Sequence, residues 1–312
     1  MAIFSKIFLK SQERNDPGLI PRELLLRGGG DIDGARPRPH DTFKPRRKEN
    51  TLMGTVRNSL SYNLALTKTI FKREFSALYR RTALGPVWAL LSPAAYLAVF
   101  IFFRLLFGLS NPEGVPMLPF LFSGLTLWLL FSTTLSAVFP SIISNVSILK
   151  KMPVSPFVFV FAGALVPLFT SAVYMVLLEV LLIVYGYAPT MHHLAIPLVV
   201  IMVQAFALAL GLLASTFGLY RQDIIQALPT FIQLGMFATP IFFSPSIVPE
   251  ALRWVVDYNP VAQCVGMLRE IIFNASWPDL ASLGKTIAVI VVFGLVAFAF
   301  FKRTSRYLAD LF

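Results

Sequence analysis

The chain has 312 residues, of which 56% are apolar and only 14% are charged. Soluble domains have about 45–50% apolar and about 25% charged residues, so this chain has too few charges to cover a soluble globule of its length. The apolar residues also gather in runs of about 20, the length of helix that crosses a bilayer. Composition therefore excludes a soluble enzyme and predicts an all-α polytopic membrane protein.

The net charge of +11 is concentrated at the beginning of the chain. Residues 1–86 contain 17 Lys and Arg against 8 Asp and Glu, and the remainder is nearly neutral. Basic residues beside a first spanning helix are typical of the cytoplasmic side, where anionic lipids attract them. We therefore expect membrane lipids as the partner of this charge, and no nucleic acid.

Two segments precede the first span. Residues 1–60 are polar, basic and rich in Gly and Pro, which predicts a disordered cytoplasmic arm. In residues 61–86 apolar side chains recur at helical spacing while Lys and Arg fill the other side, the pattern of an amphipathic helix lying in the membrane interface. Gly85 and Pro86 end this helix.

Residues 87–312 predict a transmembrane domain of six helices. The expected spans are about 87–109, 118–139, 156–185, 194–219, 226–243 and 283–301. Basic residues occur in alternate loops, at Lys150, Lys151 and Arg221, and again in the tail. The positive-inside rule then places both termini in the cytoplasm.

The segment 244–282 then lies on the outer side, and it is too polar to span twice yet too apolar for a free loop. Prolines divide it into two expected short helices, about 248–257 and 260–273. We expect re-entrant helices that turn back into the outer leaflet and cap a pathway, because irregular backbone at that depth needs cover from protein or water. An amphipathic pair lying on the membrane surface is the alternative.

Sequence motifs for chemistry are missing. Gly284-Lys285-Thr286 resembles the end of a phosphate-binding loop, but Asp279 stands where that loop needs a glycine. Of the histidines, His192 and His193 are adjacent in an outer loop, where a solvated turn is expected instead of a metal site. We predict no catalytic residues, no metal site and no cofactor, so the chain is not expected to be an enzyme.

Two charged residues fall within expected spans. Arg104 lies near the outer end of the first span, where it can snorkel to phosphate headgroups or meet an anionic substrate group. Glu179 lies deeper in the third span, where it is neutral, paired within the protein, or part of a substrate or gating site.

Aromatic residues are abundant, with 29 Phe, 9 Tyr and 4 Trp. Many belong to interfacial belts or face lipid, but an aromatic wall also suits sugar, because the C–H faces of pyranose rings stack on aromatic rings. The candidates for lining a channel are Tyr96, Phe100, Phe131 and Phe237.

Several segments in order resemble the permeases that export polysaccharides and polyol phosphates. The stretch from the interfacial helix into the first span carries Arg73, Tyr79, Thr82, Leu84, Gly85, Trp88 and Pro93 at the family's positions. The second span matches at Gly124, Trp128 and Phe131, and the following loop at Asn145, Leu149 and Lys151. Shorter pieces after the fourth span, around Asn259-Pro260 and in the tail complete a resemblance that covers about residues 62–312.

The resemblance implies the transmembrane subunit of a type 2 ABC exporter in a bacterial inner membrane. Two copies of the chain would pair with two nucleotide-binding ATPase subunits, which hold the ATP and magnesium. The cargo would be a lipid-linked polysaccharide such as O antigen, capsule or teichoic acid, carried on undecaprenyl diphosphate.

The resemblance also assigns residues to roles. Contact with the ATPase is expected at Arg73, Asn145, Leu149, Lys150 and Lys151. Arg80 and Arg81 would attract the anionic lipid diphosphate, as basic residues at the membrane surface do. The outer gate would comprise Pro249, Trp254, Asn259 and Pro260.

Two other transport functions stay open, and an enzymatic one lacks support. The nearest is an exporter of the same ABC type that carries a drug or a small lipid. An ion-coupled secondary transporter would need intramembrane acids and commonly inverted repeats, and Glu179 is its main support. A membrane-embedded transferase would need a polar catalytic loop with His or Asp clusters, which the sequence does not show.

Overall fold

The computed structural model contains helices and no strands among the residues it describes, which are 60–80, 85–106, 108, 114–151, 154–219, 221 and 223–305. All of them lie in one unit of the chain, Arg47–Phe312. The expected arm of residues 1–60, except Leu60, and the basic residue Arg81 lie outside the described residues.

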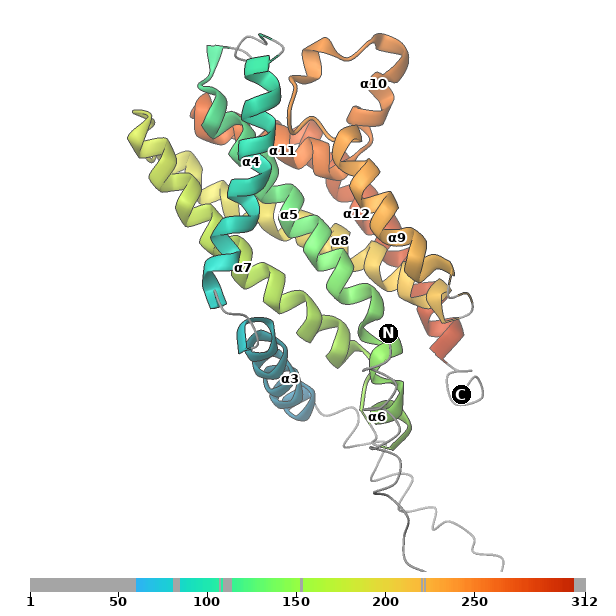
Figure 1. Ribbon diagram of the computed structural model, residues 1–312. Coiled ribbons are helices and arrows are strands. Elements are labelled where there is room, and N and C mark those ends of the chain that lie inside the picture. Colours follow the sequence, from blue (N-terminus) through green and yellow to red (C-terminus); the bar gives the residue numbers. More distant parts are fainter. Residues whose placement is uncertain are drawn as a thin grey trace, which may run out of the picture. The chain divides into compact units, whose positions relative to one another are not determined.

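The expected interfacial helix is α3 (Leu60–Arg80). Ile70 on α3 is buried against Val158, Phe159 and Ala162 at the beginning of α7 (Phe157–Val184). The turn η2 (Gly85–Val87) then leads into α4 (Trp88–Leu106). Figure 1 shows α3 beside the first turns of α7, with α4 following it.

Among the described residues, four segments are long and apolar enough to cross a membrane: Met117–Leu149, Phe157–Val184, Met191–Gly218 and Leu280–Thr304. They contain α5 (Met117–Ser141), α7, α8 (Ile196–Gly218) and α12 (Leu280–Ser305). The first segment continues from α5 through η4 (Ile143–Asn145) into α6 (Val146–Lys151).

The other two expected spans are shorter helices. In α4 the apolar helical stretch is Leu90–Phe103, and α9 (Asp223–Ala238) has 16 residues. We expected the fifth span to reach residue 243, but the helix ends at Ala238, because Pro240 follows and the residue before a proline is disfavoured in helical conformation. Length and composition thus support four of the six expected spans.

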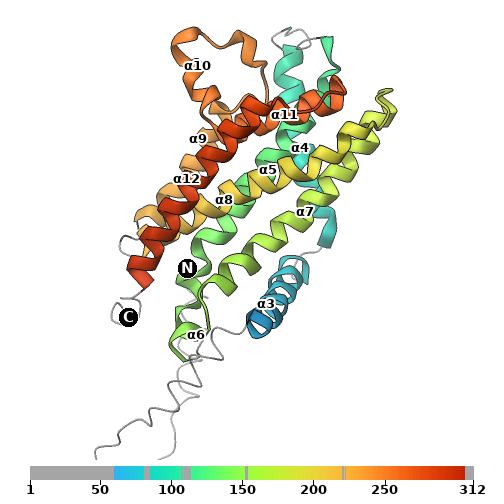
Figure 2. The ribbon, with the colours of Figure 1, turned by 180° about the vertical axis from the view of Figure 1, so that it is seen from behind.

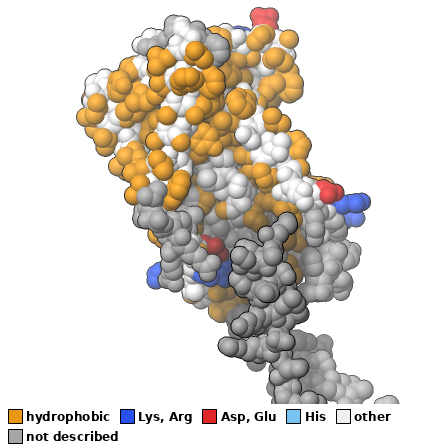
Figure 3. All heavy atoms as spheres, in the orientation of Figure 1, with side chains coloured by type: hydrophobic (Ala, Val, Ile, Leu, Met, Phe, Trp, Pro, Cys, Tyr) orange, Lys and Arg blue, Asp and Glu red, His pale blue; other side chains and the backbone are white. Residues whose placement is uncertain are grey.

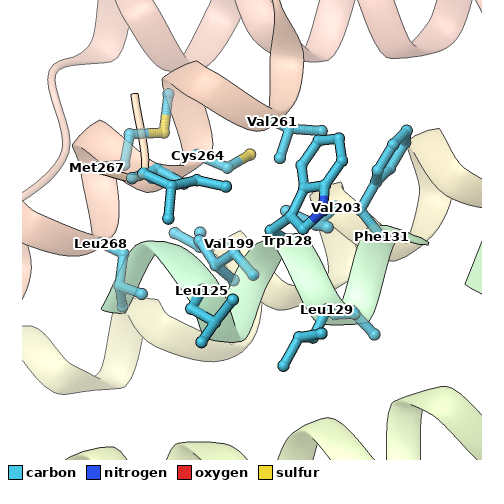
Figure 4. Packing of buried hydrophobic residues seen from close by; sticks show 14 of the residues in the cluster. Leu125, Trp128, Leu129, Phe131, Val199, Val203, Val261, Cys264, Met267 and Leu268 are labelled. Carbon is cyan, nitrogen blue, oxygen red and sulfur yellow. The ribbon is translucent and has the colours of Figure 1, made fainter. Parts of the chain in front are cut away.

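The core is built around α5, which packs against α7 on one side and α8 on another, while α12 packs against α8. Both ribbon views agree with this order (Figures 1 and 2). Figure 4 shows side chains of α5, α8 and a third helix, α11 (Pro260–Phe273), pointing toward one another. The buried residues labelled there include Leu125, Val203 and Leu268.

The outer segment forms the two short helices that the prolines indicate. After η6 (Pro245–Ile247), α10 (Glu250–Asp257) and α11 occupy almost the expected ranges. Asn259 starts α11 as its N-cap, since its Oδ1 accepts from the backbone N–H groups of Val261 and Ala262, and Pro260 takes the first helical position. Most of α11 is buried, so it is not a surface helix, whereas α10 is largely exposed.

Hydrophobic side chains cover most of the coloured surface in Figure 3, and the charged ones lie toward the ends of the molecule. Exposed large apolar residues occur along α4, α7, α9 and α12. Because soluble monomers rarely expose contiguous apolar patches of this extent, this surface fits a helical bundle surrounded by lipid.

Candidate functional site

Two of the residues expected to contact an ATPase meet at one end of the bundle. Arg73 on α3 donates from Nη2 to Asn145 Oδ1 at 3.4 Å and to Glu74 Oε1 at 2.7 Å. Asn145, in η4, is itself held in place because its Nδ2 donates to the Ser141 carbonyl at 2.8 Å. The contact joins elements 72 residues apart in the sequence.

A hydrophobic contact reinforces this junction. Leu149 on α6 packs against the cluster that contains Ile70 of α3 and Phe159 of α7. We call the group formed by α3, η4, α6 and the first turns of α7 the inner junction. Apolar packing and a polar contact therefore both link η4 and α6 to α3.

For most of the remaining basic candidates the structure does not describe the side chain. Lys151 is exposed on α6. Lys150 lies on α6 and Arg80 ends α3, but their side chains are outside the described part of the chain, as is all of Arg81. The predicted attraction between Arg80, Arg81 and a lipid diphosphate therefore stays a prediction.

A cleft of about 840 Å³ lies beside the inner junction. Four helices contribute to its walls: α3 with Ile70 and Glu74, α4 with Trp88, α5 with Thr133, and α7 with Val166. Most of the surface is apolar, and polar groups of Glu74 and Asn145 contribute to it where α3 meets η4.

A second cavity, of about 440 Å³, lies among α5, α8 and α9. Trp128 and Phe131 of α5, Phe217 of α8 and Phe231 of α9 give it aromatic walls. Thr239 and Asn259 also line it, and Asn259 Nδ2 donates to Thr239 Oγ1 at 3.1 Å.

The two cavities lie on opposite faces of α5. Thr133, Ala137 and Pro140 face the first cleft, whereas Trp128, Phe131 and Leu135 face the second cavity. At 100° per residue these two sets are separated by about half a turn of the helix. The central helix therefore divides an α3 side of the molecule from an α9 side.

The four aromatic candidates for lining a channel do not share one wall. Phe131 lies in the second cavity and stacks on Phe206 with ring centroids 5.7 Å apart. Phe100 stacks on Phe242 at 3.4 Å. Tyr96 on α4 and Phe237 on α9 have exposed side chains.

The four residues expected at an outer gate belong to two different helices. Pro249 precedes α10 and Trp254 on that helix is 62% exposed, while Asn259 and buried Pro260 begin α11. The hydrogen bond from Asn259 to Thr239 ties the beginning of α11 to the end of α9.

Sequence reasoning missed the most buried charged group in this region, Arg269 on α11. Its Nη1 donates to the Pro240 carbonyl at 2.7 Å, and its Nη2 donates to the carbonyls of Ile241 at 2.9 Å and Phe120 at 3.2 Å. The guanidinium also lies over the Phe120 ring, 3.5 Å from its centroid. Arg269 thus joins α11, the chain after α9 and the beginning of α5, which we call the outer junction.

The sequence signal that could have identified Arg269 is a single cation in an otherwise apolar stretch. In the structure this cation lies beside Gly124, which is distant in the sequence. A Cβ added at Gly124 would lie 3.0 Å from Arg269 Nη2 and 3.1 Å from the backbone of Ile241. Gly124 therefore provides the space in which the guanidinium reaches its acceptors.

Glu179 is paired within the protein. Its Oε1 lies 3.6 Å from His193 Nε2, and the backbone N–H of Thr190 donates to His193 Nδ1 at 3.1 Å. Accepting that bond at Nδ1 leaves the ring proton on Nε2, which points it toward the carboxylate. The expectation of a solvated histidine turn was wrong for His193, whose side chain is only 14% exposed. The Arg104 side chain lies outside the described part.

A family model and several individual relatives all identify this chain as similar to the membrane subunits of transporters. The model of the ABC-2 type transporter membrane family matches residues 65–273. The O-antigen export system permease protein RfbA of Myxococcus xanthus is 27% identical over 258 residues, covering 82% of this chain and 98% of that protein.

Two further relatives cover similar parts of the chain. RfbA of Klebsiella pneumoniae is 26% identical over 256 residues, covering 78% of this chain and 94% of the relative. The polysialic acid transport protein KpsM of Escherichia coli is 24% identical over 245 residues, covering 77% and 92%.

Proposed function

Because the chain belongs to the ABC-2 type transporter family, we propose that it is the transmembrane subunit of an ATP-driven exporter that moves a lipid-linked polysaccharide across a bacterial inner membrane. The observation that carries the proposal is the set of relatives named for O-antigen export and polysialic acid transport, each matched over more than nine-tenths of its own length.

The energy for export comes from a separate ATPase subunit. The inner junction supports this part of the proposal, since Arg73 and Asn145 hold α3 against the loop that carries α6 and Lys151. ATP and magnesium bind on the partner chain, and its movement reaches the membrane helices through α6 and α3.

The working unit contains two copies of the chain, each with six spans and with both termini in the cytoplasm. In this arrangement α4 and α9 are the first and fifth spans, shorter than the others but apolar. Helix α3 lies in the inner interface, and α10 and α11 lie in the outer half as re-entrant helices.

The polymer passes on the α9 side of α5. Aromatic walls at Trp128, Phe131 and Phe231 suit sugar rings, and the exposed aromatic side chain of Phe237 continues along α9. At the outer end, Asn259 and Arg269 hold α9 and α11 together, so movement of this pair opens or closes the exit.

A deletion strain tests the function. Removing the gene for this chain should abolish the polysaccharide on the cell surface while lipid-linked polymer accumulates inside, and the intact gene should restore export. Purification of the tagged chain should bring an ATPase subunit with it. Normal surface polysaccharide in the deletion strain would refute the proposal.

A further inference from the structure

Polar side chains lie on the face of α9 that points away from the second cavity. Gln226, Thr230 and Gln233 are all exposed on this face. We propose that this face of α9 is a contact between two copies of the chain, in which Gln226 and Gln233 each pair with the same residue of the second copy. The proposal rests on the two-copy unit of the proposed function and adds the surface by which the copies meet.

The two glutamines lie on the opposite side of α9 from the residues that face the bundle. Leu228 and Gly235 line the second cavity, and each follows one of the glutamines by two positions. At 100° per residue this spacing separates them by about half a turn of the helix. Since α9 lies at the edge of the bundle, the glutamine side chains point out of it (Figure 1).

Gln233 lies at a depth where lipid is an unfavourable neighbour. Helix α9 begins at Asp223, and Gln233 is about 15 Å further along the helix axis at 1.5 Å per residue. In the six-span arrangement this distance is half of a hydrocarbon core of about 30 Å. An amide without a hydrogen-bond partner in hydrocarbon costs free energy, so polar side chains at this depth usually face another helix.

A second copy of the chain supplies the partner that Gln233 needs. Two copies with the same orientation in a membrane are related by a two-fold axis along the bilayer normal, so a residue close to the axis meets itself. A glutamine amide has two N–H donors and a carbonyl acceptor. It can therefore donate to its counterpart and accept from it at the same time.

The spacing of the glutamines suits a pair of helices that run in the same direction. Gln226 and Gln233 are seven residues apart, which is almost exactly two turns, so both lie on nearly the same side of α9. A seven-residue repeat keeps both positions in contact when two helices cross at about 20°, a common angle in membrane bundles. Thr230 lies between them and adds a small polar side chain to the contact.

Disulfide cross-linking of the full chain tests the contact. The chain has one cysteine, Cys264, which is buried, so the parent chain gives the background. Gln233→Cys and Gln226→Cys are made separately in membranes of the deletion strain and oxidised with copper phenanthroline. Each should give at least about tenfold more covalent dimer than the parent, because residues that meet on the axis lie within reach of a disulfide.

Two exposed positions serve as controls for the cross-link. Ala238 is on the same helix but lines the second cavity, and Leu295 on α12 is 65% exposed. Ala238→Cys and Leu295→Cys should remain at the background of the parent. Cross-linking at these positions as strong as at Gln233, or none at either glutamine position, would overturn the contact.

A water-soluble maleimide distinguishes the other neighbours that this face of α9 could have. In a helix contact Gln233→Cys should react as slowly as Leu295→Cys. Rapid reaction with little cross-linking would show a watery path, and slow reaction with little cross-linking would show lipid. Either result would overturn the contact.

The amides are tested by Gln226→Leu combined with Gln233→Leu. The fold of a single chain should not change, because the contact lies between copies. Self-association of the purified chain in lipid bilayers, counted by single-molecule photobleaching, should weaken about tenfold. Unchanged association would overturn the pairing of the glutamines.

Surface polysaccharide in the same deletion strain reports on the proposed function separately. Normal polysaccharide from cells whose glutamine-to-cysteine variants do not cross-link would overturn the contact and leave the proposed function standing. Normal polysaccharide in the strain without any copy of the chain would refute the proposed function, whatever the cross-links show.

Discussion

Arg269 shows how one side chain can hold three parts of a membrane protein together. A guanidinium has five N–H groups in a fixed plane, so it can satisfy several backbone carbonyls at once. Two of its acceptors, the carbonyls of Pro240 and Ile241, lie in the non-helical segment that follows α9, where the backbone forms no helical hydrogen bonds. The cation on α11 therefore holds the segment after α9 and the beginning of α5 in place.

We predict that Arg269→Ala lowers the free energy of unfolding by about 3 kcal/mol or more. Three carbonyls that now accept from the guanidinium lose their donor, and each buried unsatisfied group costs about 1–3 kcal/mol. Thermal unfolding of the purified chain in detergent measures the effect. Arg253→Ala is the control, since Arg253 is exposed on α10 and its removal should change the stability by less than about 0.5 kcal/mol.

Asp279 makes the stability of the fold at the beginning of α12 depend on pH. Its Oδ2 accepts from the backbone N–H of Ser282 at 2.9 Å at the beginning of α12, and this bond lowers the pKa of Asp279 below its usual value. A carboxyl group with a lowered pKa stabilises the fold above its unfolded pKa and loses this effect as the pH falls through the folded pKa.

We therefore expect the thermal stability of the protein to fall below about pH 4, with part of this loss absent from Asp279→Asn. Asn can still accept the hydrogen bond of a helix N-cap but does not titrate in this range. Unfolding midpoints of both proteins across the acid range provide the measurement. Identical acid profiles would show that Asp279 does not contribute.

Among the helices, the long apolar ones were predictable and the junctions between them were not. The structure places α5, α7, α8 and α12 close to the expected second, third, fourth and sixth spans, because long apolar runs have few alternative structures in a membrane protein. The ends of α4 and α9 depend on glycine, proline and packing. The expected fifth span therefore extended past the true end of its helix at Ala238.

The inner junction was foreseen only in part. The resemblance pointed to Arg73 and Asn145, yet it could not show that their side chains meet, since such a contact depends on how α3 lies against η4. Arg269 was overlooked because an arginine on a short amphipathic helix is usually exposed. Its acceptors come from segments up to 149 residues away in the sequence.

Within the proposed function, Asn145→Ala should impair export more than it impairs folding. Asn145 is half-buried and links α3 to the loop before α6, so its removal weakens the connection that transmits movement from the ATPase. We expect at least a tenfold lower rate of surface polysaccharide appearance, with normal amounts of protein in the membrane.

The matched control for Asn145→Ala is Ser147→Ala, an exposed position two residues further along the chain, which should export normally. Arg73→Ala should resemble Asn145→Ala, because it removes the other side of the same contact. Full export by both Asn145→Ala and Arg73→Ala would contradict a coupling role for the inner junction.

At the scale of the molecule, a buried polar bridge joins the three central helices. Thr134 of α5 donates to Gln204 Oε1 of α8 at 2.9 Å, and Gln204 Nε2 donates to the Ala164 carbonyl of α7 at 2.8 Å. Hydrogen bonds between helices in a membrane contribute on average about 0.6 kcal/mol, and at most about 2. The bridge adds directional contacts to a tightly packed apolar interface.

Gln204→Leu should therefore destabilise the chain by about 1 kcal/mol, through the loss of both hydrogen bonds. Gln233→Leu on α9 is the control, because Gln233 is exposed and its replacement should leave the stability unchanged or slightly raised. A double-mutant cycle with Thr134→Val, read by thermal unfolding in detergent, isolates the bond between the two side chains. A coupling energy of zero would show that the bridge does not stabilise the fold.

The bridge has a consequence for how the molecule can change shape. It fastens α5, α7 and α8 into a frame, whereas Met236 is the single buried residue of α9, and Pro93 the single one among the described side chains of α4. Few buried side chains hold α4 and α9 against these three helices, so we expect α4 and α9 to shift their positions more readily than α5, α7 and α8. Under the proposed function, a ligand that fixes α4 or α9 against α5, α7 and α8 should block export without unfolding the protein.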